Sequence, residues 1–240
     1  MYEKELRLSK MGEEPEIFKS IQGEGRYANE ECGFIRLAGC NLRCEWCDSS
    51  YTWDFKQFDK QAETMQLETG KAIDLITGLE VDRLVITGGE PLLQQDSIIE
   101  LLEPMRAENP DFWTEVETNG TIKPKDELNQ LIDQYNVSIK LSNSGNELYK
   151  SINDEALVYF INNPKADFKF VVGGANDFSE IDALVHGYEI PKDRVFIMPE
   201  GKTKEEQIEK MAIVHNLATS KGYQFTPRYH VLKWGDKRGV

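Results

Sequence analysis

Residues 39–54 read GCNLRCEWCDSSYTWD and contain three of the four cysteines in the chain. Cys40, Cys44 and Cys47 have the spacing C-x3-C-x2-C and follow directly after the predicted strand 33–38. Thiolates at this spacing can converge on one metal centre when the backbone curls into a loop. Because zinc sites and iron–sulfur clusters usually take four protein ligands, three thiolates leave one metal position open. An open position is typical of a catalytic centre, so the loop predicts a centre that binds a small molecule.

Other interpretations of the three thiols remain open at this point. Cys32 lies eight residues before Cys40, about 20 Å or more away along an extended strand, so it is a poor fourth ligand. Zinc could use the three thiolates and one histidine (His186, His215 or His230), although none of these belongs to an H-x3-H pair. The thiols could also be buried structural groups, but their clustering in a polar loop argues against this.

The bulk composition limits the class of protein and its partners. The chain has 240 residues, 40% of them hydrophobic, which suits one large domain with a sizeable core. Its formal net charge is −14, from 42 acidic and 28 basic residues, so it is a poor match for a nucleic-acid backbone. No apolar run reaches the roughly 18 residues that span a membrane, and the charged N-terminus lacks a secretory signal. We therefore expect a cytoplasmic protein that binds neither nucleic acid nor a membrane.

Short β-branched runs alternate along the chain with longer amphipathic runs, which predicts βαβ units and a parallel sheet. The predicted strands are residues 33–38, 83–87, 113–117, 137–141, 168–172, 195–198 and 223–231. The predicted helices are residues 64–77, 95–107, 125–134, 179–187 and 204–219. The last helix is preceded by Thr203, and Glu206 follows three residues later, which is the pattern of a capping box.

Polar and glycine-rich motifs follow several predicted strands. TGGE (87–90), ETNG (117–120), the stretch 142–145 and PEG (199–201) each come directly after one of them. In a βα barrel the active site lies at the carboxyl ends of the strands, and in a doubly wound open sheet the ligand lies at the same ends. The motifs therefore predict a site at this edge of the sheet, without choosing between the two folds.

The cysteine loop, with Trp46 just before its third cysteine, resembles the radical S-adenosylmethionine (SAM) motif. The chain resembles one family with that motif, the 7-carboxy-7-deazaguanine synthases, through FKSIQGEG (18–25), residues 34–54, VITGGEP (85–91), ETNGT (117–121) and WGDKRGV (234–240). This resemblance covers nearly the whole chain. It implies an α/β fold, a modified and incomplete (βα) radical-SAM barrel formed by residues 1–240 as a single domain. It also implies that the C-terminal tail, about residues 228–240, folds into the active site.

The resemblance implies the cofactors and the reaction. Cys40, Cys44 and Cys47 would hold a 4Fe–4S cluster, whose fourth iron binds the amino and carboxylate groups of SAM. Reductive cleavage of SAM would give a 5′-deoxyadenosyl radical, so no protein side chain is expected to be the catalytic group. The implied enzyme is a carbon–nitrogen lyase of the queuosine pathway. It would convert 6-carboxy-5,6,7,8-tetrahydropterin to 7-carboxy-7-deazaguanine with loss of ammonia.

The resemblance also implies residues for each ligand. Those implied for SAM are Trp46, Cys47, Asp48, Gly89, Glu90, Ser138 and Lys140. Those implied for the pterin substrate are Ile21, Gln22, Gly23, Arg36, Thr87, His230 and Val240. Mg²⁺ would be held by Ser49, at a position where the family commonly has threonine. Lys237 or Arg238 would tie the tail down.

Several of these residues have simpler interpretations from the sequence alone. Arg36 alternates with apolar residues on a strand, so it faces either a salt-bridge partner on a polar surface or the interior of the barrel. The glycines of SIQGEG suit an ordinary tight turn, and Lys140 at a strand end suits a solvated position. Ile139 stands where the family more often has proline, which leaves the local backbone geometry open.

The resemblance implies a homodimer and a flavodoxin- or ferredoxin-like electron donor. The sequence does not identify the donor, the strength of the Mg²⁺ requirement or the fate of the product. Two rival functions remain open. One is an activating enzyme for a glycyl-radical protein, which shares the C-x3-C-x2-C motif, and the other is a non-catalytic zinc-binding interaction module.

Overall fold

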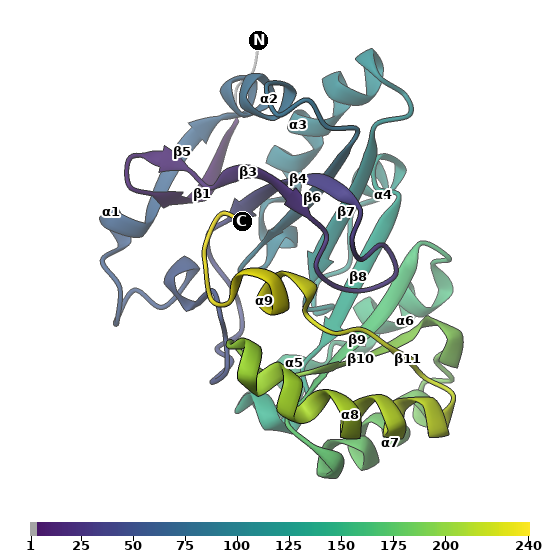
Figure 1. The fold of residues 1–240 in the computed structure, drawn as a ribbon. Coiled ribbons are helices and arrows are strands. Elements are labelled where there is room, and N and C mark those ends of the chain that lie inside the picture. The colour runs from purple at the N-terminus through teal and green to yellow at the C-terminus, as the bar shows by residue number, and fades with distance from the viewer. Residues whose placement is uncertain (1–3) are drawn as a thin grey trace.

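A single curved sheet runs through the computed structural model, which describes residues 4–240 (Figure 1). Its parallel part follows the order β4-β6-β7-β8-β9-β10-β11. These strands are β4 (Glu31–Leu37), β6 (Arg83–Gly88), β7 (Trp113–Thr118), β8 (Gln134–Ile139), β9 (Ala166–Val172), β10 (Val195–Pro199) and β11 (Gln224–Phe225). The strand order ends at β11 on one side and at the N-terminal strands on the other, so the sheet is open. The expected incomplete α/β barrel is thereby confirmed.

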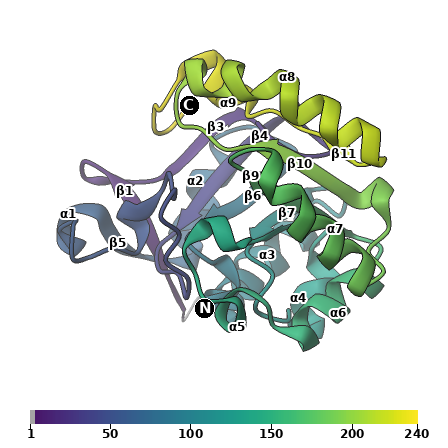
Figure 2. The ribbon, with the colours of Figure 1, turned by 90° about the horizontal axis from the view of Figure 1, so that it is seen from below.

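Helices cover the outer face of this sheet (Figure 2). They are α2 (Thr69–Thr77), α3 (Gln95–Glu108), α4 (Asp126–Leu131), α5 (Leu148–Ser151), α6 (Asp154–Asn162), α7 (Phe178–Gly187) and α8 (Lys204–Lys221). Apolar side chains of the strands and helices form one core cluster, in which Ile35, Leu84, Tyr135 and Phe168 are fully buried. Burial of each such side chain contributes about 1.5–3 kcal/mol. This core explains why apolar strands alternate with amphipathic helices in the sequence.

The N-terminal part of the chain extends the sheet with antiparallel strands. They are β1 (Glu5–Met11), β2 (Glu14–Pro15), β3 (Ile17–Ile21) and β5 (Thr64–Glu68), the last preceded by the short helix α1 (Lys60–Glu63). The sequence analysis did not predict these strands, and its helix 64–77 is wrong at its start. Residues 64–68 pair with β1, with Leu6 opposite Leu67. Met65 and Leu67 alternate with polar residues, and this period of two is the signal that the prediction overlooked.

The C-terminal segment differs most from its prediction. The expected strand 223–231 is only two residues long, because Pro227 cannot donate a hydrogen bond to the sheet. The chain then forms α9 (Tyr229–Trp234), which buries Val231. Figure 1 shows α9 and the chain end crossing in front of the parallel strands.

The remaining predicted elements agree with the structure to within a few residues. The main differences are β8, which starts three residues earlier than predicted, α4, which ends three residues earlier, and α5 and α6, which were not predicted. The capping box before α8 is confirmed, because the Glu206 backbone N–H donates to Thr203 Oγ1 over 3.2 Å. None of the helices within residues 4–240 has the length and apolar character needed to cross a membrane.

Candidate active site

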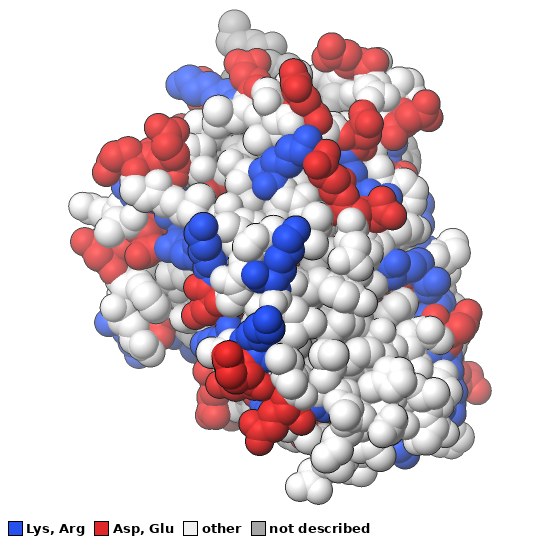
Figure 3. Space-filling model, viewed as in Figure 1, with Lys and Arg blue, Asp and Glu red and all other residues white. Residues whose placement is uncertain are grey.

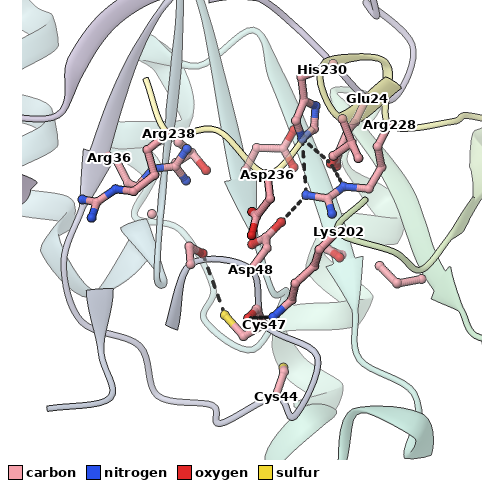
Figure 4. Close-up of a pocket in the computed structure, with 18 of the residues that line it drawn as sticks. Glu24, Arg36, Cys44, Cys47, Asp48, Lys202, Arg228, His230, Asp236 and Arg238 are labelled. Atoms are coloured by element: carbon pink, nitrogen blue, oxygen red, sulfur yellow. Dashed lines mark hydrogen bonds and ion pairs between the residues drawn. The ribbon is translucent and has the colours of Figure 1, made fainter. Parts of the chain in front are cut away.

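A cavity of about 260 Å³ opens at the carboxyl ends of the parallel strands (Figure 4). Three segments that are distant in sequence meet there: the cysteine loop (residues 39–54), the lid (residues 21–25, between β3 and β4) and the tail (residues 228–240). Sixteen of the residues named from the sequence line it: Ile21, Gln22, Gly23, Arg36, Cys40, Cys44, Trp46, Cys47, Asp48, Ser49, Thr87, Gly89, Ser138, Lys140, His230 and Val240. Glu90 is not among the lining residues.

The cysteine loop is held in place by the loops that follow β8 and β10. The Glu45 backbone N–H donates to Ser144 O over 3.0 Å, and the Arg43 N–H donates to Asn146 Oδ1 over 2.9 Å. Lys202 reaches from the other side, and its Nζ donates to the Cys47 carbonyl over 2.9 Å. These contacts fix a loop whose own sequence specifies neither helix nor strand.

The three thiols fit an iron–sulfur cluster better than a single ion. Cys40, Cys44 and Cys47 are free and half-buried on the wall of one cavity. Within residues 4–240 no three Cys, His, Asp or Glu side chains are grouped closely enough to hold one metal ion. Zinc would need its sulfur ligands within about 4 Å of one another, because each lies about 2.3 Å from the metal. A four-iron cluster binds each thiolate through a different iron, which allows a wider spacing.

Two of the three histidines considered for zinc lie away from the thiols, whereas His230 lines the cavity, with its Nε2 3.3 Å from Arg228 Nη2. His186 lies in the last turn of α7, and His215 lies on α8 with its ring 5.1 Å from that of Phe225. Neither lines the cavity. Burial raises the pKa of the Cys40 thiol to about 12, so the protein alone keeps this thiol protonated. A metal centre would have to displace that proton to bind the thiolate.

The two glycines of TGGE bring β6 against the cysteine loop. The Gly89 backbone N–H donates to Leu37 O over 3.0 Å. A Cβ atom on Gly89 would lie 2.2 Å from the carbonyl oxygen of Gly39, so only glycine fits there. The motif therefore lets β6 pack directly against the cysteine loop, and the Gly89 backbone forms part of the cavity wall.

Glu90 lies behind the cavity wall instead of in it. It is fully buried, and its carboxylate accepts hydrogen bonds from Thr118 Oγ1 (2.8 Å), Asn119 N (2.7 Å) and Leu92 N (3.0 Å). Burial raises its pKa, although these donors oppose the shift. Glu90 thus fixes the ETNG loop, whose Thr118 and Asn119 do line the cavity.

The lid and the tail interlock. The Tyr229 backbone N–H donates to Gly23 O over 2.9 Å, and the Gly25 N–H donates to Thr226 Oγ1 over 2.8 Å. A Cβ atom on Gly23 would lie 1.9 Å from His230 Nδ1, so the close approach of the two segments requires glycine. SIQGEG is therefore more than an ordinary turn, because its backbone is the docking surface for the tail.

Charged side chains alternate in sign across the cavity in the order Asp48, Arg228, Glu24, Lys169 and Glu117. Arg228 binds Asp48 through Nη2 and Glu24 through Nε, the latter at 3.0 Å. Lys169 Nζ lies 2.5 Å from Glu24 Oε2 and 2.8 Å from Glu117 Oε2. Figure 4 shows Arg228, Glu24 and His230 on one side of the cavity and Asp48 nearer its centre, joined to Arg228 by a dashed line. We call these five residues the charge row.

The charge row lowers the pKa of Asp48 and Glu24, and burial lowers the pKa of the neighbouring His230. Burial alone would raise the pKa of Asp48, but Arg228 outweighs burial and lowers it to about 2. For Glu24, burial is likewise outweighed by Lys169 and Arg228, and its pKa falls well below the usual range. Burial lowers the pKa of His230 to about 4, so its imidazole is neutral at pH 7. Asp48 and Glu24 are thus ionised next to Arg228, and the imidazole of His230 beside them is neutral.

Two arginines form the opposite side of the cavity (Figure 4). Fully buried Glu16 accepts hydrogen bonds from Arg36 Nε (2.8 Å), Arg238 Nη2 (3.0 Å) and Tyr51 OH (3.2 Å). Arg238 also binds Glu63 over 2.9 Å, and its guanidinium lies 3.6 Å from the centre of the Tyr51 ring. Arg238 therefore holds the end of the tail, while Tyr229 and Arg228 hold its beginning.

The residues expected beside SAM and Mg²⁺ lie next to the cysteine loop. Lys140 Nζ donates to Ser138 Oγ over 2.6 Å and lies 5.3 Å from the centre of the Trp46 ring. Lys140 is thus held at the site. Ser49 is buried, and its Oγ lies 3.8 Å from Cys47 Sγ.

The sequence analysis missed four charged residues of the site: Glu16, Lys169, Lys202 and Arg228. Lys169 and Arg228 did carry a signal, because each is a lone charge in an otherwise apolar or neutral predicted strand. Such a charge is rarely buried without a partner. The partners themselves lie far away in the sequence, so no local pattern identified them.

Comparison with known proteins assigns the chain to a family. Residues 21–170 match the family model described as a 4Fe-4S single cluster domain. A 7-carboxy-7-deazaguanine synthase of Pyrobaculum aerophilum is 39% identical over 93% of this chain and 95% of that protein. One of Halobacterium salinarum is 34% identical over 92% of this chain and 90% of that protein.

Two solved structures have a similar fold. The crystal structure of QueE from Escherichia coli aligns with a TM-score of 0.67 at 22% identity, and the match covers 94% of this chain and 95% of that one. The structure of Streptococcus suis SuiB bound to S-adenosylmethionine aligns with a TM-score of 0.53 at 15% identity, covering 78% of this chain and 48% of that one. At these identities the likeness concerns the fold alone.

Proposed function

The chain belongs to the 7-carboxy-7-deazaguanine synthase family of radical SAM enzymes, and we propose that it converts 6-carboxy-5,6,7,8-tetrahydropterin to 7-carboxy-7-deazaguanine with loss of ammonia. One observation carries this proposal. The cysteine loop, the lid and the tail each carry a motif that resembles the family, and all three line the same cavity. A site that joins a cluster-binding loop to a covered cavity suits radical chemistry on a small molecule, because the cover excludes water from the reaction.

We propose that Cys40, Cys44 and Cys47 hold the 4Fe–4S cluster. When bound, the cluster and SAM supply the radical that removes a hydrogen atom from the substrate, while the protein supplies binding and orientation. SAM would contact Trp46, Asp48, Gly89, Ser138 and Lys140. We assign Glu90 a positioning role, since its carboxylate holds the backbone of the ETNG loop and lies outside the cavity lining.

The arginine side of the cavity suits the carboxylate of the substrate. Arg36 uses Nε for Glu16, which leaves its two Nη atoms to donate to a carboxylate. On the opposite side, neutral His230 and the amide and backbone groups of Ile21, Gln22 and Gly23 suit a flat heterocycle with several donors and acceptors. Thr87 and the Val240 carboxylate complete the proposed contacts.

A magnesium ion is proposed at Ser49. Mg²⁺ usually keeps several of its waters and takes only one or two protein oxygens together with a ligand carboxylate. The buried Ser49 hydroxyl lies on the cavity wall and offers one such oxygen. Ser49 would hold the ion, and the ion would offset part of the negative charge of the substrate carboxylate.

The proposed partners follow from the cofactor and from the open sheet. We propose a flavodoxin- or ferredoxin-like electron donor and a location in the cytoplasm, where thiols stay reduced. A homodimer would cover sheet edges that a monomer leaves exposed. Sedimentation of the reconstituted enzyme tests the dimer directly.

The decisive experiment is anaerobic incubation of the reconstituted protein with dithionite, SAM and the carboxytetrahydropterin, followed by mass analysis. We expect formation of the deazapurine and release of ammonia. Formation of 5′-deoxyadenosine without the deazapurine would reject this substrate while keeping the radical chemistry. A colourless protein with one zinc per chain would reject both.

A further inference from the structure

Each thiol of the cysteine loop accepts a hydrogen bond from an N–H group. Two of the donors lie in the cysteine loop itself and the third follows β8. The amide of that third residue, Asn146, also donates to Ser144 Oγ over 3.1 Å. The pairs are Leu42 N to Cys40 Sγ at 3.4 Å, Asn146 Nδ2 to Cys44 Sγ at 3.3 Å and Trp53 Nε1 to Cys47 Sγ at 3.4 Å. The Leu42 donor belongs to the backbone. A fourth, longer contact joins Asn119 Nδ2 to Cys40 Sγ at 3.9 Å, but this amide donates mainly to Asn41 Oδ1, at 2.8 Å. The shorter side-chain donors are therefore those of Asn146 and Trp53.

Both side-chain donors are held in place by further contacts. Asn146 follows η3 (Ser142–Ser144) and accepts the Arg43 backbone N–H through Oδ1 over 2.9 Å. This bond fixes which end of the amide faces the sulfur. Trp53 ends η1 (Ser50–Thr52), and its ring faces the Arg43 guanidinium at 5.7 Å. Both donors are therefore fixed by contacts with Arg43 of the cysteine loop.

Reduction of an iron–sulfur cluster adds negative charge that the thiolate sulfurs partly carry. An N–H dipole aimed at such a sulfur stabilises the reduced form more than the oxidised form, and so it raises the reduction potential. We propose that the Trp53 indole and the Asn146 amide raise the reduction potential of the cluster through Cys47 and Cys44. The inference rests on the cluster of the proposed function and not on its substrate.

The first test compares two identical substitutions in one loop. Trp53→Phe keeps an aromatic ring beside Arg43 but removes the N–H that faces Cys47. Trp46→Phe is the matched control, because the Trp46 N–H donates to Asn143 Oδ1 over 3.2 Å and not to sulfur. Both proteins are titrated electrochemically without SAM, and the reduced cluster is followed by electron paramagnetic resonance.

At one fixed potential we expect the ratio of reduced to oxidised cluster to fall about threefold to tenfold in Trp53→Phe. A tenfold change corresponds to about 59 mV for a one-electron couple. Trp46→Phe should stay at the value of the unmodified protein. Equal potentials in all three proteins, or equal shifts in both variants, would overturn the proposal.

The second test uses Asn146→Asp, which keeps the acceptor for Arg43 and replaces the donor that faces Cys44. Asn41→Asp is its control, because it adds the same charge beside another thiol, Cys40, without removing a donor to sulfur. The Asn41 amide donates to Thr121 Oγ1 over 2.8 Å, and Asp keeps the oxygen that accepts from Asn119 Nδ2. We expect Asn146→Asp to lower the potential more than Asn41→Asp. An equal shift would mean that charge alone, and no hydrogen bond, acts on the cluster.

A third measurement does not depend on how well any Trp53 variant folds. The unmodified protein labelled with ¹⁵N in its indole groups should show a nitrogen hyperfine coupling to the reduced cluster, and Trp46→Phe should retain it. No coupling in the unmodified protein would overturn the role of Trp53. All three readouts are taken without pterin, so they stand even if the proposed substrate is wrong.

Discussion

The cysteine loop and the contact between lid and tail line the same cavity, but different interactions hold them. The loop is contiguous in sequence, and mainly neutral amides fix it, among them Asn119, Asn143 and Asn146. The lid and tail are about 200 residues apart, and the ion pair of Glu24 with Arg228 joins them beside Asp48. Neutral partners suit a loop whose cofactor changes charge, whereas an ionic joint can hold two distant segments together.

Basic and acidic side chains on the surface around the site also gather in separate regions. Figure 3 shows Lys and Arg side chains gathered around α9 and the chain end, with Asp and Glu over the first turns of α8. The protein as a whole is strongly acidic, at −14. Its basic residues at the site are therefore local features, of which Arg228 and Arg238 belong to the tail itself, and they are not part of a generally basic surface.

The largest expected effect tests the cysteine loop separately from the contact between lid and tail. Cys47→Ala should abolish the cluster, with loss of colour and iron and with activity at background, because a cluster needs all three thiolates. Cys32→Ala is the matched control, since Cys32 is fully buried elsewhere and its loss should cost only stability. Iron analysis and absorption spectra check both variants. Full iron content in Cys47→Ala would contradict the assignment of the loop.

Breaking the ionic joint should leave the cluster intact. Arg228→Met removes the partner of Asp48 and of Glu24, whose side chain is 13% exposed. Loss of one partner of a fully buried pair costs about 3–5 kcal/mol, and we expect a smaller loss here. We expect a lower Tm and a turnover reduced at least tenfold, with unchanged iron content. A double-mutant cycle with Glu24→Gln should show coupling between the two residues. Additive effects would mean that the pair does not join lid and tail.

Extension of the tail should have a similar but smaller effect. Val240 lies on the cavity wall, so residues added after it would have to enter the cavity or displace the tail. We expect a C-terminal tag to lower kcat/KM about tenfold or more while iron content stays the same. The same tag on the N-terminus is the control. Equal kinetics for both tagged proteins would show that the chain end is not part of the site.

A pH effect on stability is expected beneath the lid. Glu115 is fully buried and interacts with Gln22, Asn136, Glu117 and Arg83. Burial, with help from the charge of Glu117, raises its pKa to about 8. The folded state therefore keeps a proton that the unfolded chain has lost, and this contribution to stability falls as pH rises from about 4.5 to about 8.

The substitution Glu115→Gln tests this effect, because it copies the protonated form. Relative to the unmodified protein, its free energy of unfolding should increase by about 2 kcal/mol between pH 6 and pH 8, since each pH unit is worth about 1.4 kcal/mol. Denaturant unfolding at both pH values measures it. The same difference at both pH values would show that Glu115 is ionised in the folded protein.

The smallest expected effect concerns the metal at Ser49. Ser49→Thr adds a methyl group that restricts the hydroxyl rotamer, so we expect half-maximal activity at about half the Mg²⁺ concentration. Ser49→Ala removes the oxygen ligand and should raise that concentration about tenfold. Activity measured against Mg²⁺ concentration distinguishes the two. An identical response of all three proteins would remove Ser49 from the metal site.

The sequence predicted the parallel strands and most of the outer helices because their apolar periodicity is local. It failed at residues 64–68 and 223–231, where partners or a single proline decide between helix and strand. Most residues expected in the site do line the cavity, since motifs at strand ends come together in any sheet of this kind. Glu90 is the exception, because nothing local shows which way its carboxylate turns.

The sequence by itself determined the chemistry of this protein: three thiols in one short loop, placed after a strand, define what the centre can bind. The tertiary structure decided which charges meet. Glu16 with Arg238, and Glu24 with Lys169 and Arg228, are pairs that only the path of the folded chain creates. The physical reason is burial, because a buried charge must find a partner, and the partner's distance along the chain does not matter once the chain has folded.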